Sequence, residues 1–256
     1  MCTVTWWMSP DGSGYELFFN RDERRSRQPA EPPKLFHRLA VNYLAPTDTD
    51  YRGTWLLVND RGVTLALVNH YPQEPQPPKT PARSRGLLAR DLADSESIAE
   101  IRERLGRARL HHYSPMFIFA FERGEAPVKW TWDSRNLLEE PAAEPLPFFT
   151  SSSFRSEDIR RHRRKLFAEN WADKGRLDPR SLSEFHLHRE TEQPAFGILM
   201  DRPNARTVSL SHIVVGPGAE AVFAYQSRQP EDGTLPNAPL VSRLELVNSR
   251  SSEAAL

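Results

Sequence analysis

A series of short apolar runs, joined in pairs by turn residues, constrains the fold of this chain most. Four such pairs are expected as hairpins, at residues 2–6 with 15–20, 54–59 with 63–69, 115–122 with 127–132, and 206–215 with 219–226. The second pair flanks Asp60-Arg61-Gly62, and the last flanks Gly216-Pro217-Gly218, both typical of tight turns. A further short strand is expected at residues 148–151. This pattern favours layered antiparallel sheets over an alternating parallel fold.

The expected helices are grouped between these hairpins. They cover residues 85–93, 97–105, 156–171 and 178–188. Ser97 and Glu100 have the spacing of a capping box, and Asp178-Pro179 is a typical helix start. In the third helix, Ile159, Leu166, Phe167 and Trp171 fall on one face. Strands and helices in separate groups predict the α+β class.

Composition limits the function classes. The 256 residues include 34 Lys plus Arg and 34 Asp plus Glu, a balance that gives no general attraction to nucleic acid or an anionic membrane. A single cysteine excludes an intramolecular disulfide and suits a reducing compartment. Neither a signal peptide nor an apolar run of about 20 residues is present. We therefore expect a cytoplasmic protein with no integral membrane segment.

The domain boundary is expected near the point where the composition becomes polar. Residues 1–228 form one predicted domain, and residues 229–256 form a polar C-terminal extension. Within this extension, residues 240–247 could add an edge strand, and the Ser-rich end is expected to be a disordered tail.

Cys2 is the first candidate for chemistry because of its position. Removal of Met1 would leave a cysteine whose thiol can attack and whose α-amine, with an ordinary pKa of about 7.7–8.0, can accept the proton. The alternative is that a lone cysteine is simply a small buried residue in a strand.

Asn20-Arg21-Asp22-Glu23 follows the second expected strand. The first hairpin would return this segment to the beginning of the first strand, next to Cys2. Arg21 could then lower the pKa of the thiol, and Asp22 could hold the protonated α-amine. Alternatively, the segment is an exposed ion-pair cluster, because Arg24, Arg25 and Arg27 follow directly.

The order of several short motifs resembles the NRDE-motif family, which includes transport and Golgi organisation protein 2. These motifs are Met1-Cys2, Asn20-Arg21-Asp22-Glu23, Arg27-Gln28-Pro29-Ala30, Gly53-Thr54-Trp55-Leu56, Asn59-x-x-Gly62, Ala66-Leu67-x-x-Asn69, Arg85-Gly86 and Arg206-Thr207-Val208-Ser209. The family is similar to N-terminal nucleophile (Ntn) hydrolases of the bile-salt and penicillin V acylase type. The resemblance implies an αββα sandwich of two antiparallel sheets between helical layers.

The resemblance also implies roles for individual residues. Cys2 would be the nucleophile, Arg21 and Asp22 the charged pair beside it, Asn69 an oxyanion donor and Arg206 a late active-site arginine. The expected substrate-binding residues are Asn20, Ser151 and Ser152. Where the acylases place an asparagine after the short middle strand, this chain has Thr150-Ser151-Ser152-Ser153, and a serine hydroxyl has a shorter reach and fewer donors.

Other motifs carry weaker signals. His186-x-His188-x-Glu190 could hold a metal on a strand, but a helix here places the histidines on different faces, so no metal is expected. The basic side of the helix at 156–171 accompanies an apolar stripe and is expected to be a solvated face rather than a nucleic-acid site. The sequence has neither a P-loop nor a dinucleotide glycine motif, and we expect no cofactor.

Two functions from different classes remain open. The first is an N-terminal nucleophile amidohydrolase, in which Cys2 attacks a non-peptide C–N amide bond of a small molecule and forms a thioester. The second is a non-catalytic carrier of an apolar ligand on the same scaffold, with a lipid, an acyl-CoA or haem as the ligand that the resemblance implies.

Overall fold

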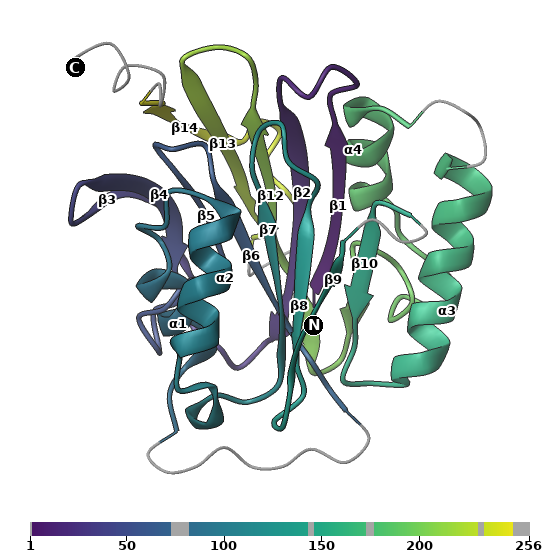
Figure 1. Ribbon diagram of the computed structural model, residues 1–256. Helices are drawn as coiled ribbons and strands as arrows, with labels where there is room; N and C mark the ends of the chain where they lie inside the picture. The colour runs from purple at the N-terminus through teal and green to yellow at the C-terminus, as the bar shows by residue number, and fades with distance from the viewer. Residues whose placement is uncertain (1, 73–81, 143–145, 173–176, 230–232, 248–256) are drawn as a thin grey trace, which may run out of the picture.

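Two antiparallel β-sheets face each other, and helices cover both outer faces (Figure 1). The computed structural model describes residues 2–72, 82–142, 146–172, 177–229 and 233–247. The four layers are the αββα sandwich that the resemblance implied, so the α+β class and its layering are confirmed.

The first sheet contains the beginning of the chain. Its strands, in spatial order, are β10 (Phe148–Ser151), β1 (Cys2–Met8), β2 (Tyr15–Arg24), β12 (Ala205–Val215), β13 (Glu220–Ser227) and β14 (Leu240–Glu245), with β11 (Asp201–Arg202) paired to β12. The predicted first and last hairpins are confirmed as β1–β2 and β12–β13. Residues 240–245 do form an edge strand, and the expected disordered tail at 248–256 lies outside the described residues.

The second sheet follows the chain order from edge to edge. Its strands are β3 (Glu31–Arg38), β4 (Val41–Thr47), β5 (Leu56–Asn59), β6 (Thr64–Asn69), β7 (Met116–Phe121), β8 (Val128–Trp132) and β9 (Leu137–Pro141). The hairpins β5–β6 and β7–β8 were expected, whereas β3, β4 and β9 were not. β3 and β9 are edge strands, where proline is tolerated because one row of N–H groups needs no partner.

The helices divide between the two outer faces. They are α1 (Arg85–Asp91), α2 (Ile98–Arg107), α3 (Ser156–Phe167) and α4 (Pro179–Leu187), with short η1 (Leu110–His112) and η2 (Ala168–Ala172) segments. Apolar residues of α1 and α2 pack against the outer face of the second sheet. Those of α3 and α4 pack around Phe18 and Phe148 on the outer face of the first sheet. None of the helices within the described ranges is both long and apolar enough to cross a membrane.

Two glycines fix α1 against the second sheet. A Cβ atom on Gly86 would lie 2.8 Å from the backbone nitrogen of Thr54, and one on Gly53 would lie 2.5 Å from the carbonyl carbon of Gly86. Because neither glycine has a Cβ, the two backbones can touch and the Thr54 N–H can donate to the Gly86 oxygen at 3.0 Å. This contact sets the position of Arg85 at the first turn of α1.

Candidate active site

Cys2 lies at the first position of β1, on the sheet face that points into the sandwich. It is 7 % exposed and belongs to the same buried cluster as Val4 and Trp6. Its cross-strand partners are Arg21 on β2 and Ser151 on β10. Side chains directly opposite each other in an antiparallel pair share a face. The hairpin therefore brings Cys2 and the segment at 20–23 together, as the sequence indicated.

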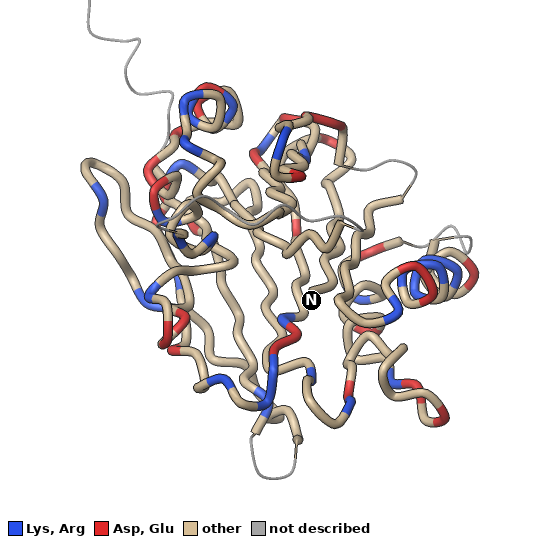
Figure 2. The backbone as a smooth tube through the Cα atoms, turned by 90° about the horizontal axis from the view of Figure 1, so that it is seen from below, with Lys and Arg blue, Asp and Glu red and all other residues tan. Residues whose placement is uncertain are grey.

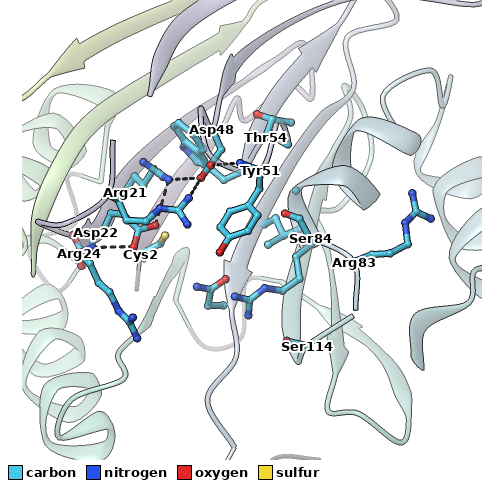
Figure 3. Close-up of a pocket in the computed structure, with 18 of the residues that line it drawn as sticks. Cys2, Arg21, Asp22, Arg24, Asp48, Tyr51, Thr54, Arg83, Ser84 and Ser114 are labelled. Carbon is cyan, nitrogen blue, oxygen red and sulfur yellow. Dashed lines mark hydrogen bonds and ion pairs between the residues drawn. The ribbon is translucent and has the colours of Figure 1, made fainter. Parts of the chain in front are cut away.

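Arg21 is held by three partners beside Cys2. Its Nη2 atom donates to Oδ2 of Asp48 at 2.8 Å and to Oε2 of Glu23 at 3.3 Å. Its guanidinium carbon also lies 4.1 Å from the centre of the Trp55 ring, which fits a cation–π contact. These contacts fix the guanidinium at the cavity wall, and Figure 3 shows it next to Asp48 and close to Cys2.

The Asp22 carboxylate belongs to a buried polar network. Its Oδ1 atom accepts a hydrogen bond from the Thr207 hydroxyl at 2.6 Å, and its Oδ2 atom lies 3.8 Å from Nη1 of Arg163. Arg163, on α3, also donates to the hydroxyls of Thr3 and Thr150 at 3.0 Å each. A charged α3 residue is thus inserted beneath β1, where it balances the buried carboxylate.

Burial raises the pKa of the Cys2 thiol above its usual value, and the nearby Asp22 carboxylate acts in the same direction. The positive charge at the start of the chain, a hydrogen bond from the Asp22 backbone N–H and the Arg21 guanidinium lower the pKa, but they do not cancel the effect of burial. Arg21 therefore lowers the pKa of the Cys2 thiol, as expected, but its effect is not enough to bring that pKa below the ordinary value.

A cavity of about 610 Å³ opens beside Cys2 between the first sheet and the α1 side of the second (Figure 3). Its charged lining residues are Arg21, Arg24, Arg27, Arg83 and Arg85 with Asp22, Glu23 and Asp48. Asn69, at the end of β6, also lines it, and its side-chain Nδ2 donates to the Tyr71 hydroxyl at 3.2 Å. Seen from below, the beginning of the chain lies near the centre of the molecule, next to a run of acidic and basic residues (Figure 2).

Ser151 and Ser152 lie at the end of β10, next to this site. Ser151 faces Cys2 across the strand pair, and within the described residues no group hydrogen-bonds to its buried hydroxyl. The Ser152 hydroxyl instead closes a local turn, because it donates to the Phe154 oxygen at 2.7 Å and accepts from the Phe154 N–H. Of the two serines, Ser151 is therefore the one oriented toward the thiol.

Two sequence candidates lie away from the cavity. Asn20 is fully buried on the opposite face of the sheet, where its amide contacts the backbone of His186 and Ile198 and the ring of His186. Arg206 pairs with Glu23 across the β2–β12 ladder, yet its side chain is not part of the cavity wall. Period-two alternation places Asn20 on the sheet face opposite to Arg21. Asp22 shares that outer face, where it contacts Thr207 and Arg163, but it also lines the cavity.

Sequence reasoning missed several cavity residues. Asp48 and Trp55 hold Arg21 from the second sheet, and Arg27 also reaches Asp48, at 2.5 Å. The sequence marks Arg85 only as part of the Arg85-Gly86 motif, which indicates no role for its side chain. These residues come from loops and strand ends that meet only when the two sheets pack, so their spacing along the chain carries little signal.

Solved structures with the same architecture define the class of fold as that of the Ntn hydrolases. Penicillin V acylase from Agrobacterium tumefaciens superposes with a TM-score of 0.58 at 10 % identity over 95 % of this chain and 86 % of its own. The C2A mutant of conjugated bile acid hydrolase from Clostridium perfringens gives 0.56 at 12 %, over 96 % and 92 %. The Caenorhabditis elegans orthologue of N-acylethanolamine-hydrolyzing acid amidase gives 0.51 at 14 %, over 85 % and 93 %.

The sequence itself gives a more specific assignment. Residues 1–229 match the Transport and Golgi organisation 2 family, and the chain therefore belongs to that family. No curated protein matches the sequence significantly. The resemblance that the motifs indicated is thus confirmed, and the fold likeness to the hydrolases extends it to the architecture.

Proposed function

We propose that the protein is an N-terminal nucleophile hydrolase that cleaves a non-peptide C–N amide bond of a small molecule. The observation that supports this most is the position of Cys2, the only cysteine, at the start of β1 and on the wall of a polar cavity. Its neighbours Arg21, Asp22 and Asn69 come from the strand ends that surround the same cavity.

In the proposed reaction, removal of Met1 frees the α-amine of Cys2. This amine takes the thiol proton, and the sulfur attacks the amide carbonyl. The side-chain N–H of Asn69 donates to the oxyanion, and the proton then passes to the leaving nitrogen as the C–N bond breaks. Water, deprotonated by the same amine, attacks the thioester, so that one amide and one water yield an acid and an amine.

The surrounding residues would orient this reaction rather than take part in bond making. The Thr150 hydroxyl donates to the Cys2 carbonyl oxygen at 3.3 Å and thereby helps to fix the start of β1. Asp22, supported by Thr207 and Arg163, supplies negative charge that would stabilise the protonated α-amine. The Ser151 hydroxyl, next to Cys2 on β10, is available as a further acceptor for that amine.

The lining of the cavity also bears on the alternative function. Eight charged side chains and Asn69 face a space of about 610 Å³. A carrier of an apolar ligand would be expected to present mainly hydrophobic and aromatic walls. This lining favours a substrate with a polar reacting end, and the carrier hypothesis becomes the second candidate.

The test combines intact mass with turnover. Loss of Met1 from the purified protein, together with release of amine from a panel of N-acyl amides, is the expected result. Cys2→Ala should abolish turnover. The control is Ser9→Ala, which likewise removes a single side-chain atom but lies at the β1–β2 turn, and it should leave turnover unchanged. Retained Met1, or equal turnover by wild type and Cys2→Ala, would refute the proposal; lipid or haem bound in stoichiometric amount would then support the carrier function.

A further inference from the structure

Among the cavity arginines, neither Arg24 nor Arg85 forms an ion pair with a described carboxylate, and of these two only Arg85 is withdrawn from solvent, since Arg24 is exposed. Arg85 is half-buried in the wall, and its Nη1 atom donates to the backbone oxygen of Pro115 at 2.9 Å. Among the residues that the structure describes, no carboxylate lies within ion-pair distance of it. By contrast, Arg21 and Arg83 have carboxylates at 2.8 Å and 3.2 Å, from Asp48 and Asp91.

A guanidinium removed from water without an opposite charge is unfavourable, because one carbonyl oxygen does not replace its lost hydration. Burial accordingly lowers the pKa of Arg85, while nearby Tyr71 and Cys2, when they carry negative charge, and the Glu23 carboxylate, which lies beyond ion-pair distance, raise it without cancelling the effect of burial. The guanidinium has five donors in a fixed plane, and the bond to Pro115 uses one of them. The others can form the two-pronged contact that suits a carboxylate or phosphate.

The position of this side chain is set before any ligand binds. Arg85 begins α1, and the next residue, Gly86, touches the backbone of Gly53 and Thr54 so closely that a Cβ would not fit. The bond from Arg85 to Pro115 adds a second anchor, at the connection that precedes β7. A cation held in place at two points gives an anionic group a fixed site, with little conformational entropy left to lose.

We propose that Arg85 forms an anion subsite of the Cys2 cavity, and that the compound bound there carries a carboxylate or phosphate group within reach of the Arg85 guanidinium. The inference rests on the proposed function, since it specifies the substrate class of the same cavity. It predicts that neutral amides are poorer substrates than otherwise identical anionic ones.

The first experiment uses the only cysteine as a reporter and needs no turnover. Iodoacetate and iodoacetamide both alkylate the thiolate with loss of iodide, but only iodoacetate is anionic. The ratio of their rate constants is measured by intact mass for the folded protein and for the same chain unfolded in urea. The expected ratio is at least fivefold higher in the folded protein, because Arg85 attracts the anionic reagent.

Variants distinguish the effect of the Arg85 guanidinium on this ratio from the effect of positive charge elsewhere on the protein. Arg85→Gln should return the ratio to that of the unfolded chain, and Arg85→Lys should retain part of the preference. Arg90→Gln removes the same charge from the same helix but outside the cavity lining, and should leave the ratio as in wild type. Urea unfolding of each variant checks that it is folded; if Arg85→Gln is not, Arg85→Lys must still reduce the ratio.

An unchanged ratio in Arg85→Gln, or a folded wild type with no preference for iodoacetate over that of the unfolded chain, would overturn the subsite.

A second experiment compares N-decanoylglycine, N-decanoyl-phosphoethanolamine and neutral N-decanoylethanolamine as substrates. Faster turnover of the first or the second identifies carboxylate or phosphate as the preferred group. Iodoacetate preference without turnover of any amide would refute the hydrolase and keep the subsite, whereas equal turnover of all three would refute the subsite alone.

Discussion

The contact between α1 and the second sheet gives a sharp stability prediction for Gly86→Ala. The new Cβ atom would lie 2.8 Å and 2.9 Å from the nitrogen and oxygen of Thr54, and 3.1 Å from the carbonyl carbon of Gly53. All three are backbone atoms, so no side chain can rotate out of the way. The helix must therefore move away from the strand, which also lengthens the hydrogen bond between Thr54 and Gly86.

The change in the free energy of unfolding for Gly86→Ala is the sum of two destabilising effects and one stabilising effect. Overpacking of this kind costs about 1–3 kcal/mol, and weakening one backbone hydrogen bond costs about 1 kcal/mol. Alanine in place of glycine in a helix returns roughly 0.5–1 kcal/mol. The free energy of unfolding should therefore fall by about 2 kcal/mol. If the anion subsite exists, the displacement of α1 should also reduce the preference of Cys2 for iodoacetate.

Urea unfolding, followed by tryptophan fluorescence, measures this change, and the chain offers a matched control. Gly106 lies in α2, and no atom comes within 4 Å of a Cβ built on it. Gly106→Ala should therefore leave stability unchanged or raise it by about 0.5 kcal/mol. If Gly86→Ala is as stable as Gly106→Ala, the backbone contact is looser than the structure indicates and does not hold Arg85 in position.

Two further predictions concern buried charge. Arg163→Met should lower the free energy of unfolding by about 3–5 kcal/mol, because the variant leaves the Asp22 carboxylate buried without its cation; a loss below about 1 kcal/mol in urea would contradict this. Burial lowers the pKa of His186 to about 3, so the folded state keeps this ring neutral while the unfolded chain, near pKa 6.5, binds a proton. Stability should therefore be fully present above pH 6.5 and decrease by up to about 1.4 kcal/mol per pH unit from there down to pH 3. His186→Gln should remove this part of the slope between pH 7 and pH 5, and an unchanged slope would contradict the assignment.

The local part of the fold was accessible from the sequence. The turn at Asp60-Arg61-Gly62 and the apolar runs around it predicted β5 and β6, and Ser97 caps α2 by accepting a hydrogen bond from the Glu100 N–H, as the spacing indicated. The second half of that capping box is absent: the Glu100 carboxylate accepts from the Glu96 N–H instead. The spacing of Ser97 and Glu100 thus predicted the start of α2 correctly. It did not predict that the Glu100 side chain would bond to the N–H of Glu96 rather than to that of Ser97.

The missed strands and site residues depend on contacts between distant parts of the chain. β3 contains Pro32, Pro33 and several exposed polar residues, so neither periodicity nor propensity marks it; its pairing with β4 makes it a strand. Asp48 has no motif around it, and its role beside Arg21 appears only when the loop after β4 folds against β2. Cys2 and Arg21, in contrast, are joined by one short hairpin, which explains why their proximity could be foreseen.

Loss of Met1 and activation of the thiol are coupled in this arrangement. Burial holds the pKa of Cys2 above its ordinary value, and the positive charge at the start of the chain opposes this most strongly. Removal of Met1 would transfer that charge to the Cys2 nitrogen itself, closer to the sulfur, where its electrostatic effect increases as the distance falls. The processed protein should therefore have the lower thiol pKa.

Alkylation across a pH series tests this coupling. Wild type that has lost Met1 is compared with a variant in which a glycine inserted before Cys2 moves the amine one residue away. The alkylation rate of the variant should continue to rise above about pH 9, past the ordinary thiol pKa, and that of the processed protein should level off at a lower pH. Identical profiles would show that the α-amine does not control the thiol, and the proposed role of that amine as the base would lose its physical support.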